Sequence, residues 1–200
     1  MKLVFASNNK HKLDEVREIM PDGIEVLSLS DIGFEAEIEE TGTTLEENSK
    51  IKAETVAAFI NGENGGRKID GVFADDTGLE IDALGGKPGV FTARWAGEPA
   101  ANRKKALAEL KGQTNRQAQF RTVITLIMMN GDALLNDGMV QVSGIVRGRI
   151  AEEEYGNGGF GYDPVFIPEG YDKTFGELPA EIKNSISHRS RALQALVKIL

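Results

Sequence analysis

Two adjacent carboxylates, Asp75 and Asp76, directly follow the apolar run Val72-Phe73-Ala74. Two carboxylates at the end of a buried strand are costly unless a cation or positive side chains compensate their charge. Mg²⁺ suits such a position, because it takes oxygen ligands and usually keeps several waters. The alternative is a hairpin over residues 72–84 that turns at Thr77-Gly78, in which the aspartates make only local hydrogen bonds. Taken alone, the stretch favours the turn.

Groups suited to binding anions or metal are spread along the rest of the chain. Residues 7–12 lie at an expected strand-to-helix junction, where the free amides of a helix N-terminus attract anions. Thr44, Asn48 and Lys52 recur every four residues and so share one helix face, which in most proteins is simply solvated. The further candidates are the basic side chains Lys183, His188 and Arg189 and the carboxylates Glu37, Glu39 and Glu40.

A glycine-dense segment, residues 156–164, contains Phe160 and Tyr162. An aromatic ring there can lie against a planar ligand while backbone amides read the ligand's edge. The alternative is a tight connection whose aromatic side chains fill the core. The His188-Arg189 pair, taken alone, is typical of a protein surface.

The usual nucleotide and metal motifs are missing from the sequence. The segment 62–68 lacks the Gly-Lys-Ser/Thr ending of a P-loop, and no Gly-x-Gly-x-x-Gly follows a strand and opens a helix. The two histidines, His11 and His188, do not have the spacing of zinc ligands. Without cysteine there is no thiol nucleophile and no thiolate metal site.

The composition predicts one globular domain over residues 1–200, with room for two lobes. A net charge of −8 argues against a general nucleic-acid binder, although a small phosphorylated ligand still fits a basic cleft. No apolar run is long enough to cross a bilayer, and the N-terminus lacks a signal-peptide layout. Together with the absence of cysteine, these features predict a cytoplasmic protein without a membrane partner.

The expected elements place most candidates at strand and helix ends. Strands and helices interleave at first, an antiparallel pair follows, and Asn130-Gly131 predicts the turn of that pair. This order predicts a mixed α/β sheet. A capping box, Thr43 with Glu46 or Thr44 with Glu47, marks one helix start. We expect strands at 2–6, 24–29, 120–129, 140–146 and 165–167, and helices at 10–20, 43–60, 101–110 and 186–200.

The motifs together resemble one family, the inosine triphosphatase (HAM1-like) family of pyrophosphatases that act on non-standard purine nucleoside triphosphates. The resemblance covers nearly the whole chain in order, and the ordered set is far more specific than any single motif. It rests on Ser-Asn-Asn-x-x-Lys at 7–12, Glu-Thr-Gly-x-Thr-x-x-Glu-Asn at 40–48, Ala-Asp-Asp-Thr-Gly-Leu at 74–79, Gly-Gly-x-Pro-Gly-Val at 85–90, Ala-Arg at 93–94, Gly-x-Gly-Gly-Phe-Gly-Tyr-Asp-Pro at 156–164 and Ile-Ser-His-Arg at 186–189.

The resemblance implies a long, twisted mixed β-sheet with flanking helices in two lobes and an active-site cleft between them. It implies Mg²⁺-dependent hydrolysis of ITP, dITP and XTP to the monophosphate and pyrophosphate by a homodimer. Glu40 and Asp76 would hold the metal, and Asp76, or else its neighbour Asp75, would be the general base. Lys12 would be the main cation for the triphosphate and Lys52 the second.

The remaining site residues are also implied by the resemblance. Asn8 and His11 stand where many relatives carry smaller residues, which leaves the details of the phosphate loop open. Two rival functions are a hydrolase for pyrimidine or methylated nucleotides and a nucleotide sensor without turnover. The substrate-binding residues would be Ser7, Asn8, Asn9, Lys10, His11 and Lys12 around the triphosphate, Thr77 in contact with the substrate, and Phe160, Gly161, Tyr162, Asp163, Lys183, His188 and Arg189 around the purine.

Overall fold

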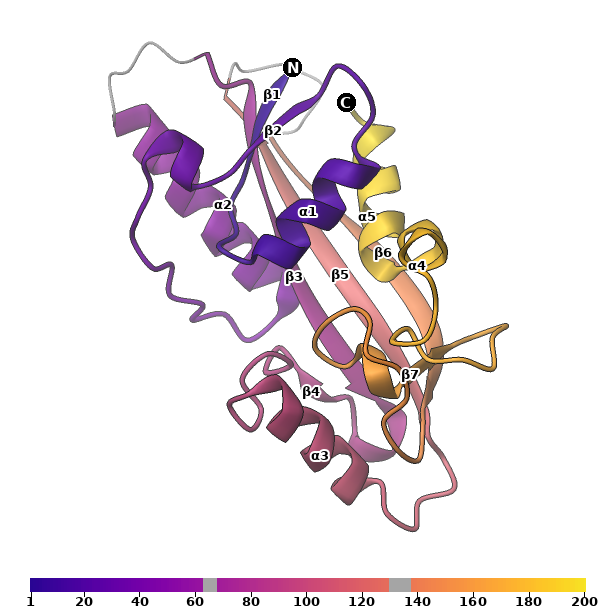
Figure 1. The fold of residues 1–200 in the computed structure, drawn as a ribbon. Coiled ribbons are helices and arrows are strands. Elements are labelled where there is room, and N and C mark those ends of the chain that lie inside the picture. Colours follow the sequence, from indigo (N-terminus) through magenta and orange to yellow (C-terminus); the bar gives the residue numbers. More distant parts are fainter. Residues whose placement is uncertain (63–67, 130–137) are drawn as a thin grey trace. The chain divides into compact units, whose positions relative to one another are not determined.

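The computed structural model describes residues 1–62, 68–129 and 138–200, and its described strands form a seven-stranded sheet (Figure 1). The strand order is β2-β1-β3-β5-β6-β7, and β4 pairs with β3. β1 is parallel to β2 and β3, whereas β4 and β7 are antiparallel to their partners, so the predicted mixed α/β sheet is confirmed. The elements are β1 (Lys2–Phe5), α1 (Lys10–Ile19), β2 (Glu25–Leu27), α2 (Leu45–Gly62), β3 (Gly71–Ile81), β4 (Lys87–Gly89), α3 (Pro99–Glu109), β5 (Gln117–Met128), β6 (Met139–Ile150), β7 (Phe166–Pro168), α4 (Ala180–Ile186) and α5 (His188–Val197).

The chain divides into two compact units, to which β3, β5 and β6 each contribute residues. The first unit consists of Met1–Asp76, Val123–Ser143 and Ala192–Leu200, and the second of Thr77–Thr122 and Gly144–Arg191. Each unit has its own buried apolar clusters. In the described part of the chain, no helix is long and apolar enough to cross a membrane.

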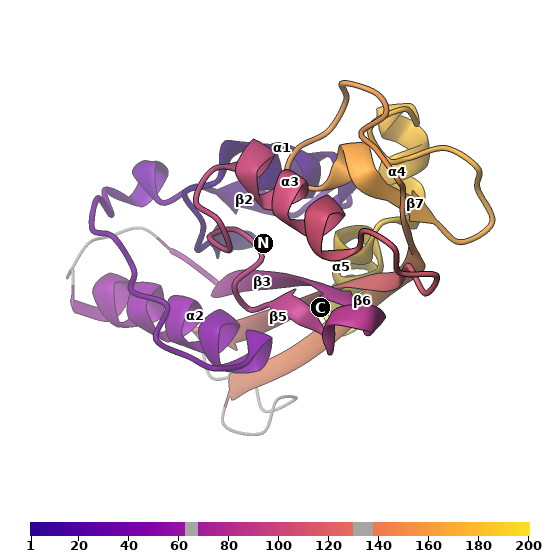
Figure 2. The same cartoon turned by 90° about the horizontal axis from the view of Figure 1, so that it is seen from below.

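In the first unit, alternate residues of β1 and β3 face two different layers of helix. Figure 2 shows the helices of these layers, with α1 and α5 on one side of the sheet and α2 on the other. Leu3, Phe5 and Phe73 pack with α1 and α5. Their neighbours Val4 and Val72 pack with α2 on the other face. This alternation is the two-residue period of a strand that is buried on both faces.

The core of the second unit is rich in aromatic rings. Phe166 packs edge-on against Phe120, with ring centroids 4.8 Å apart, and stacks on Phe175 at 5.4 Å. Leu79 and Ile81, from the second half of β3, belong to the same buried cluster. The cluster therefore fixes the strand end that follows the two aspartates.

The predicted position of the turn in the hairpin over residues 72–84 is wrong. β3 runs without interruption from Gly71 to Ile81, so Thr77-Gly78 lies inside a strand. The chain turns later, at Gly85 and Gly86, which both have positive φ, and returns as β4. Sheet pairing has overridden the local turn preference of Thr77-Gly78.

The single C-terminal helix expected over 186–200 is also wrong. α4 and α5 are separate helices, because Ser187 between them has an extended backbone with ψ of 158°. Leu193 and Leu196 are buried, whereas Leu200 is exposed. The turn predicted at Asn130-Gly131 lies outside the described residues.

Gly148 in β6 is expected to be a sensitive backbone position. A Cβ there would overlap the carbonyl oxygen of Ile167 and lie 2.8 Å from Cζ of Phe166. Replacing Gly148 with alanine should therefore lower the free energy of unfolding by about 1–3 kcal/mol, the usual cost of overpacking. Urea denaturation measures the change. The matched control is Gly62→Ala, where a Cβ meets nothing within 4 Å, and equal losses in both variants would contradict the prediction.

Candidate active site

Asp75 and Asp76 are buried in β3 and point to opposite faces of the strand. Asp75 is 1% exposed and accepts a hydrogen bond of 2.8 Å from Nζ of Lys12 in α1. Asp76 is 7% exposed and accepts one of 3.0 Å from Nζ of Lys52 in α2. Each carboxylate is thus compensated by its own lysine, and the local turn role that was the alternative does not apply.

Lys52 joins two carboxylates. Its Nζ lies 2.6 Å from Oε1 of Glu40 and 3.0 Å from Oδ1 of Asp76. Asn48, one helical turn earlier, is fully buried; its Nδ2 lies 3.4 Å from Oδ2 of Asp76, and its Oδ1 accepts a hydrogen bond from the amide of Gly42. Asn48 and Lys52 are therefore buried against β3, and the expectation of a solvated face is wrong for them, whereas Thr44 is exposed and lies before α2.

The start of α2 is fixed by the predicted capping box. The amide of Thr44 donates to Oε2 of Glu47, and the amide of Glu47 donates back to Oγ1 of Thr44. Hydrogen bonds from the backbone and side chain of Thr43, and then from Thr44, hold the pKa of Glu47 below its usual range. This cap sets the helix rotation that turns Asn48 and Lys52 toward β3.

Burial and charge have opposite effects within the Glu40–Lys52–Asp76 cluster. Burial is the largest influence on Asp76 and leaves its pKa above the usual range, although Lys52 and Lys12 both lower it. Burial would lower the pKa of Lys52, but the carboxylates of Asp76, Asp75 and Glu40 outweigh it and the net shift is upward. Lys52 therefore stays protonated, while Asp76 is a stronger base than an exposed aspartate.

Residues 7–12 form the N-terminus of α1, as predicted. Asn9 caps the helix, because its Oδ1 accepts a hydrogen bond of 3.2 Å from the amide of Lys12. The amide of Asn9 itself donates to Oγ of Ser7. Within this segment Lys12 turns toward a buried carboxylate, whereas the residues exposed to solvent are Asn8, Asn9, Lys10 and His11.

In the second unit, Asp163 and Lys183 form a buried ion pair. Asp163 is 5% exposed and Lys183 is 6% exposed. Nζ of Lys183 donates a hydrogen bond of 2.8 Å to Oδ2 of Asp163. The same oxygen accepts a hydrogen bond of 2.7 Å from the amide of Phe160. Gly159 has φ of +69°, and a Cβ there would overlap the Asp163 carboxylate, so the loop closes around this oxygen.

Phe160 and Tyr162 have different surroundings. Phe160 is partly exposed, and Lys183 Nζ and Arg189 Cζ lie 4.7 and 5.7 Å from its ring centroid. Tyr162 belongs to the buried core, and its hydroxyl donates to the carbonyl oxygen of Thr92. Burial raises the pKa of Tyr162 far above its usual range. The core-filling alternative therefore describes Tyr162, while the ring of Phe160 lies among cations.

His188 and Arg189 are buried, at 6% and 2% exposure, so the expectation of a surface pair is wrong. His188 stacks on Phe120 with centroids 4.8 Å apart, and its Nδ1 lies 2.6 Å from Oγ1 of Thr122. Thr122 in turn lies 2.8 Å from Oγ1 of Thr77. Sequence reasoning missed Thr122, because a threonine in a β-branched strand carries no signal of its own.

Arg103 is a second residue that the sequence did not single out. Its Nη1 donates a hydrogen bond of 2.9 Å to the carbonyl oxygen of Gly161. Its Nε lies 3.0 Å from Oε2 of Glu154, without hydrogen-bond alignment. Arg103 thus ties the glycine loop to α3.

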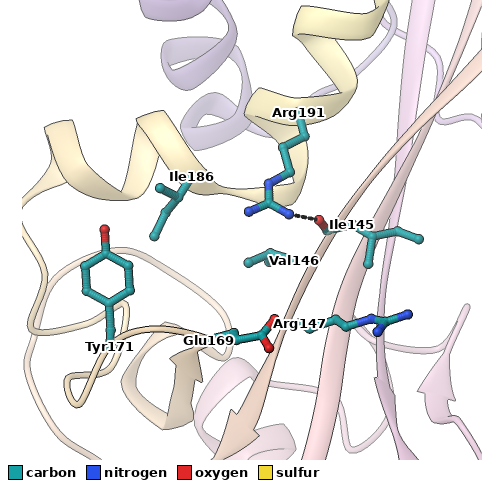
Figure 3. A pocket seen from close by; sticks show the side chains of 7 residues that line it. All are labelled: Ile145, Val146, Arg147, Glu169, Tyr171, Ile186 and Arg191. Carbon is teal, nitrogen blue, oxygen red and sulfur yellow. Dashed lines mark hydrogen bonds between the residues drawn. The ribbon is translucent and has the colours of Figure 1, made fainter.

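A pocket of about 290 Å³ in the second unit contains none of the predicted site residues (Figure 3). Arg191 lines it and donates to the carbonyl oxygen of Ile145, as the figure shows. The pocket is therefore distinct from the candidate site. Its other lining residues are Val146, Arg147, Glu169, Tyr171 and Ile186.

Comparisons with known proteins identify the family of this chain. The model of the Ham1 family matches residues 3–199. A Flavobacterium johnsoniae protein named dITP/XTP pyrophosphatase is 46% identical, over all of this chain and 98% of its own length. A Bacillus subtilis protein of the same name is 47% identical, over 98% of this chain and 96% of its own length.

Solved structures agree. The Ham1 protein of Coxiella burnetii has a TM-score of 0.84 at 36% identity, covering all of this chain and 98% of its own. The Staphylococcus aureus Ham1 protein has a TM-score of 0.81 at 39% identity, with 98% and 96% covered. These matches span nearly the whole chain, and the chain belongs to the Ham1 family.

Proposed function

We propose that this protein is a Mg²⁺-dependent pyrophosphohydrolase that converts ITP, dITP and XTP to the nucleoside monophosphate and pyrophosphate. The observation that carries the proposal is the cluster of partly exposed Glu40 with buried Lys52 and Asp76, which brings two carboxylates to one ammonium. The relatives in Flavobacterium johnsoniae and Bacillus subtilis are named dITP/XTP pyrophosphatase, which supports dITP and XTP as substrates. Because these substrates arise in the nucleotide pool, we expect the enzyme to act in the cytoplasm, and the family resemblance implies a homodimer.

The carboxylates fit the proposed metal. The described residues contain no group of three or more His, Cys, Asp or Glu side chains arranged to hold an ion. Two carboxylates suit Mg²⁺, which is usually bound by one or two of them together with waters and substrate phosphates. Glu40 and Asp76 would be the protein ligands, and the bound ion would neutralise charge on the phosphate oxygens.

The lysines and the N-terminus of α1 would bind the triphosphate. Phosphoryl transfer needs positioning and charge neutralisation more than covalent help. Lys12 and Lys52 supply positive charge, and the segment that begins at Ser7 supplies the first amides of α1. These groups would stabilise the departing pyrophosphate.

Asp76 would accept the proton of the attacking water. Burial raises its pKa above the usual range, which makes the carboxylate a better base. Asp75 lies on the opposite face of β3 and pairs with Lys12, away from Glu40. We therefore assign the base to Asp76.

The purine would be bound by the second group of residues, around Phe160. Lys183, His188 and Arg189 carry hydrogen-bond donors, which suit a 6-oxo group and meet another donor when adenine enters. An unpaired buried donor costs about 1–3 kcal/mol, or roughly 5- to 150-fold per contact.

Product analysis tests the proposal most directly. Purified protein with Mg²⁺ is incubated with ITP, XTP, ATP, GTP and dTTP in parallel. We expect monophosphate and pyrophosphate from ITP and XTP, with slower turnover of ATP and GTP. Diphosphate and orthophosphate as products would contradict the site, and preferential cleavage of dTTP would favour a pyrimidine hydrolase. Tight binding of every nucleotide without turnover would favour a sensor.

A further inference from the structure

Three side chains of the second unit form a hydrogen-bonded chain. Oγ1 of Thr77 lies 2.8 Å from Oγ1 of Thr122, which lies 2.6 Å from Nδ1 of His188. Thr122 is fully buried in β5. Phe120, two residues earlier on the same strand face, stacks on the imidazole with an interplanar angle of 29°. β5 therefore fixes both the plane of the His188 ring and the partner of its Nδ1.

By geometry either atom of each pair can be the donor, so the chain can run in two directions. Because each hydroxyl has one proton, a Thr122 that donates to Nδ1 of His188 accepts from Thr77. An imidazole whose Nδ1 is an acceptor carries its proton on Nε2 when neutral.

We propose that Thr122 is a positioning and specificity-determining residue, which holds His188 in the Nε2–H tautomer so that the imidazole presents a donor to the purine. This inference rests on the proposed function for the identity of the ligand. The 6-oxo group of hypoxanthine or xanthine accepts a hydrogen bond, whereas the 6-amino group of adenine donates one. A tautomer fixed as a donor favours the first group and opposes the second, although Thr122 itself touches no substrate.

The tautomer can be measured without any substrate. The chain has only two histidines, so ¹⁵N-histidine labelling gives two ring systems, and the His11→Gln variant assigns them. At neutral pH we expect His188 to show an unprotonated Nδ1 and a protonated Nε2. Thr122→Ser, which keeps the hydroxyl, should give the same shifts. Thr122→Val, which is nearly isosteric but has no hydroxyl, should give shifts averaged between forms.

Two NMR results would overturn the proposal. One is a wild-type His188 that carries its proton on Nδ1 or on both nitrogens, because the chain would then run the other way. The other is a valine variant with unchanged shifts. If the valine variant does not fold, the wild-type and serine spectra still decide, because both require a protonated Nε2 and an unprotonated Nδ1.

Kinetics test the consequence for specificity. We expect Thr122→Val to lower the ratio of kcat/KM for ITP to that for ATP by about 10-fold, within the range of one buried hydrogen bond, and Thr122→Ser to restore it. A purely structural role would lower both rates together and leave the ratio unchanged, which would overturn the proposal. Absence of turnover with every nucleotide in the wild-type protein would overturn the proposed function instead, and the NMR result would still stand.

Discussion

Replacing Asp76 with asparagine is expected to lower the rate of ITP hydrolysis at least about 1,000-fold. The change removes the proposed base, whose contribution alone is typically 100- to 10,000-fold, and also one of two proposed metal ligands. The side chain keeps its size, so the buried position beside Lys52 and Asn48 stays filled. Single-turnover measurement of pyrophosphate release checks the rate, and calorimetric titration with a non-hydrolysable ITP analogue checks that binding survives.

The matched control is Asp75→Asn, one residue away in the same strand. Asp75 pairs with Lys12 and not with the Glu40–Lys52 pair, so we expect this variant to retain far more turnover than Asp76→Asn. The reverse order of activities would assign the base to Asp75. Retained turnover in both variants would refute a role for either carboxylate as base.

Replacing Asp163 with asparagine is expected to cause the largest loss of stability. Breaking a buried ion pair from one side costs about 3–5 kcal/mol, because the remaining charge has no counter-charge. Here Lys183 would be left at 6% exposure, and the amide of Phe160 would lose a charged acceptor. For a chain of this size the melting temperature should fall by about 6–20 °C. Urea and thermal denaturation measure both quantities.

Two further variants make that experiment specific. The pair Lys50–Glu54 lies on the surface of α2 with side chains 46% and 53% exposed, so Glu54→Gln should cost less than about 1 kcal/mol. The double variant Asp163→Asn/Lys183→Met removes both charges and should recover part of the loss. If the double variant were as unstable as the sum of the single variants, the ion pair would not be the cause.

The sequence predicted the elements better than it predicted their surroundings. Apolar periodicity and the Thr44–Glu47 capping box located α2, because both are local properties of the chain. Whether Lys52 faced solvent or β3 depended on the partner layer, which no local pattern contains. The same limit explains the turn wrongly expected at Thr77-Gly78, where pairing with neighbouring strands decided the conformation.

The site residues were found by resemblance more than by their residue types. The His188-Arg189 pair taken alone is typical of a surface, and its burial became evident only with α5 in place. Their roles in binding remain predictions for the variants above. Thr122 was beyond reach, since its hydroxyl matters only through the distant His188.

The opposite orientation of Asp75 and Asp76 makes β3 sensitive to its length. A strand delivers successive side chains to alternate faces, so the loss or gain of one residue before Asp75 would exchange the two carboxylates between the α1 and α2 layers. A deletion would bring Asp76 to Lys12 and leave Lys52 without its aspartate, whereas an insertion would bring Asp75 to Lys52 and leave Lys12 without one. During divergence, this strand can therefore accept changes of residue type among its apolar positions far more readily than an insertion or a deletion.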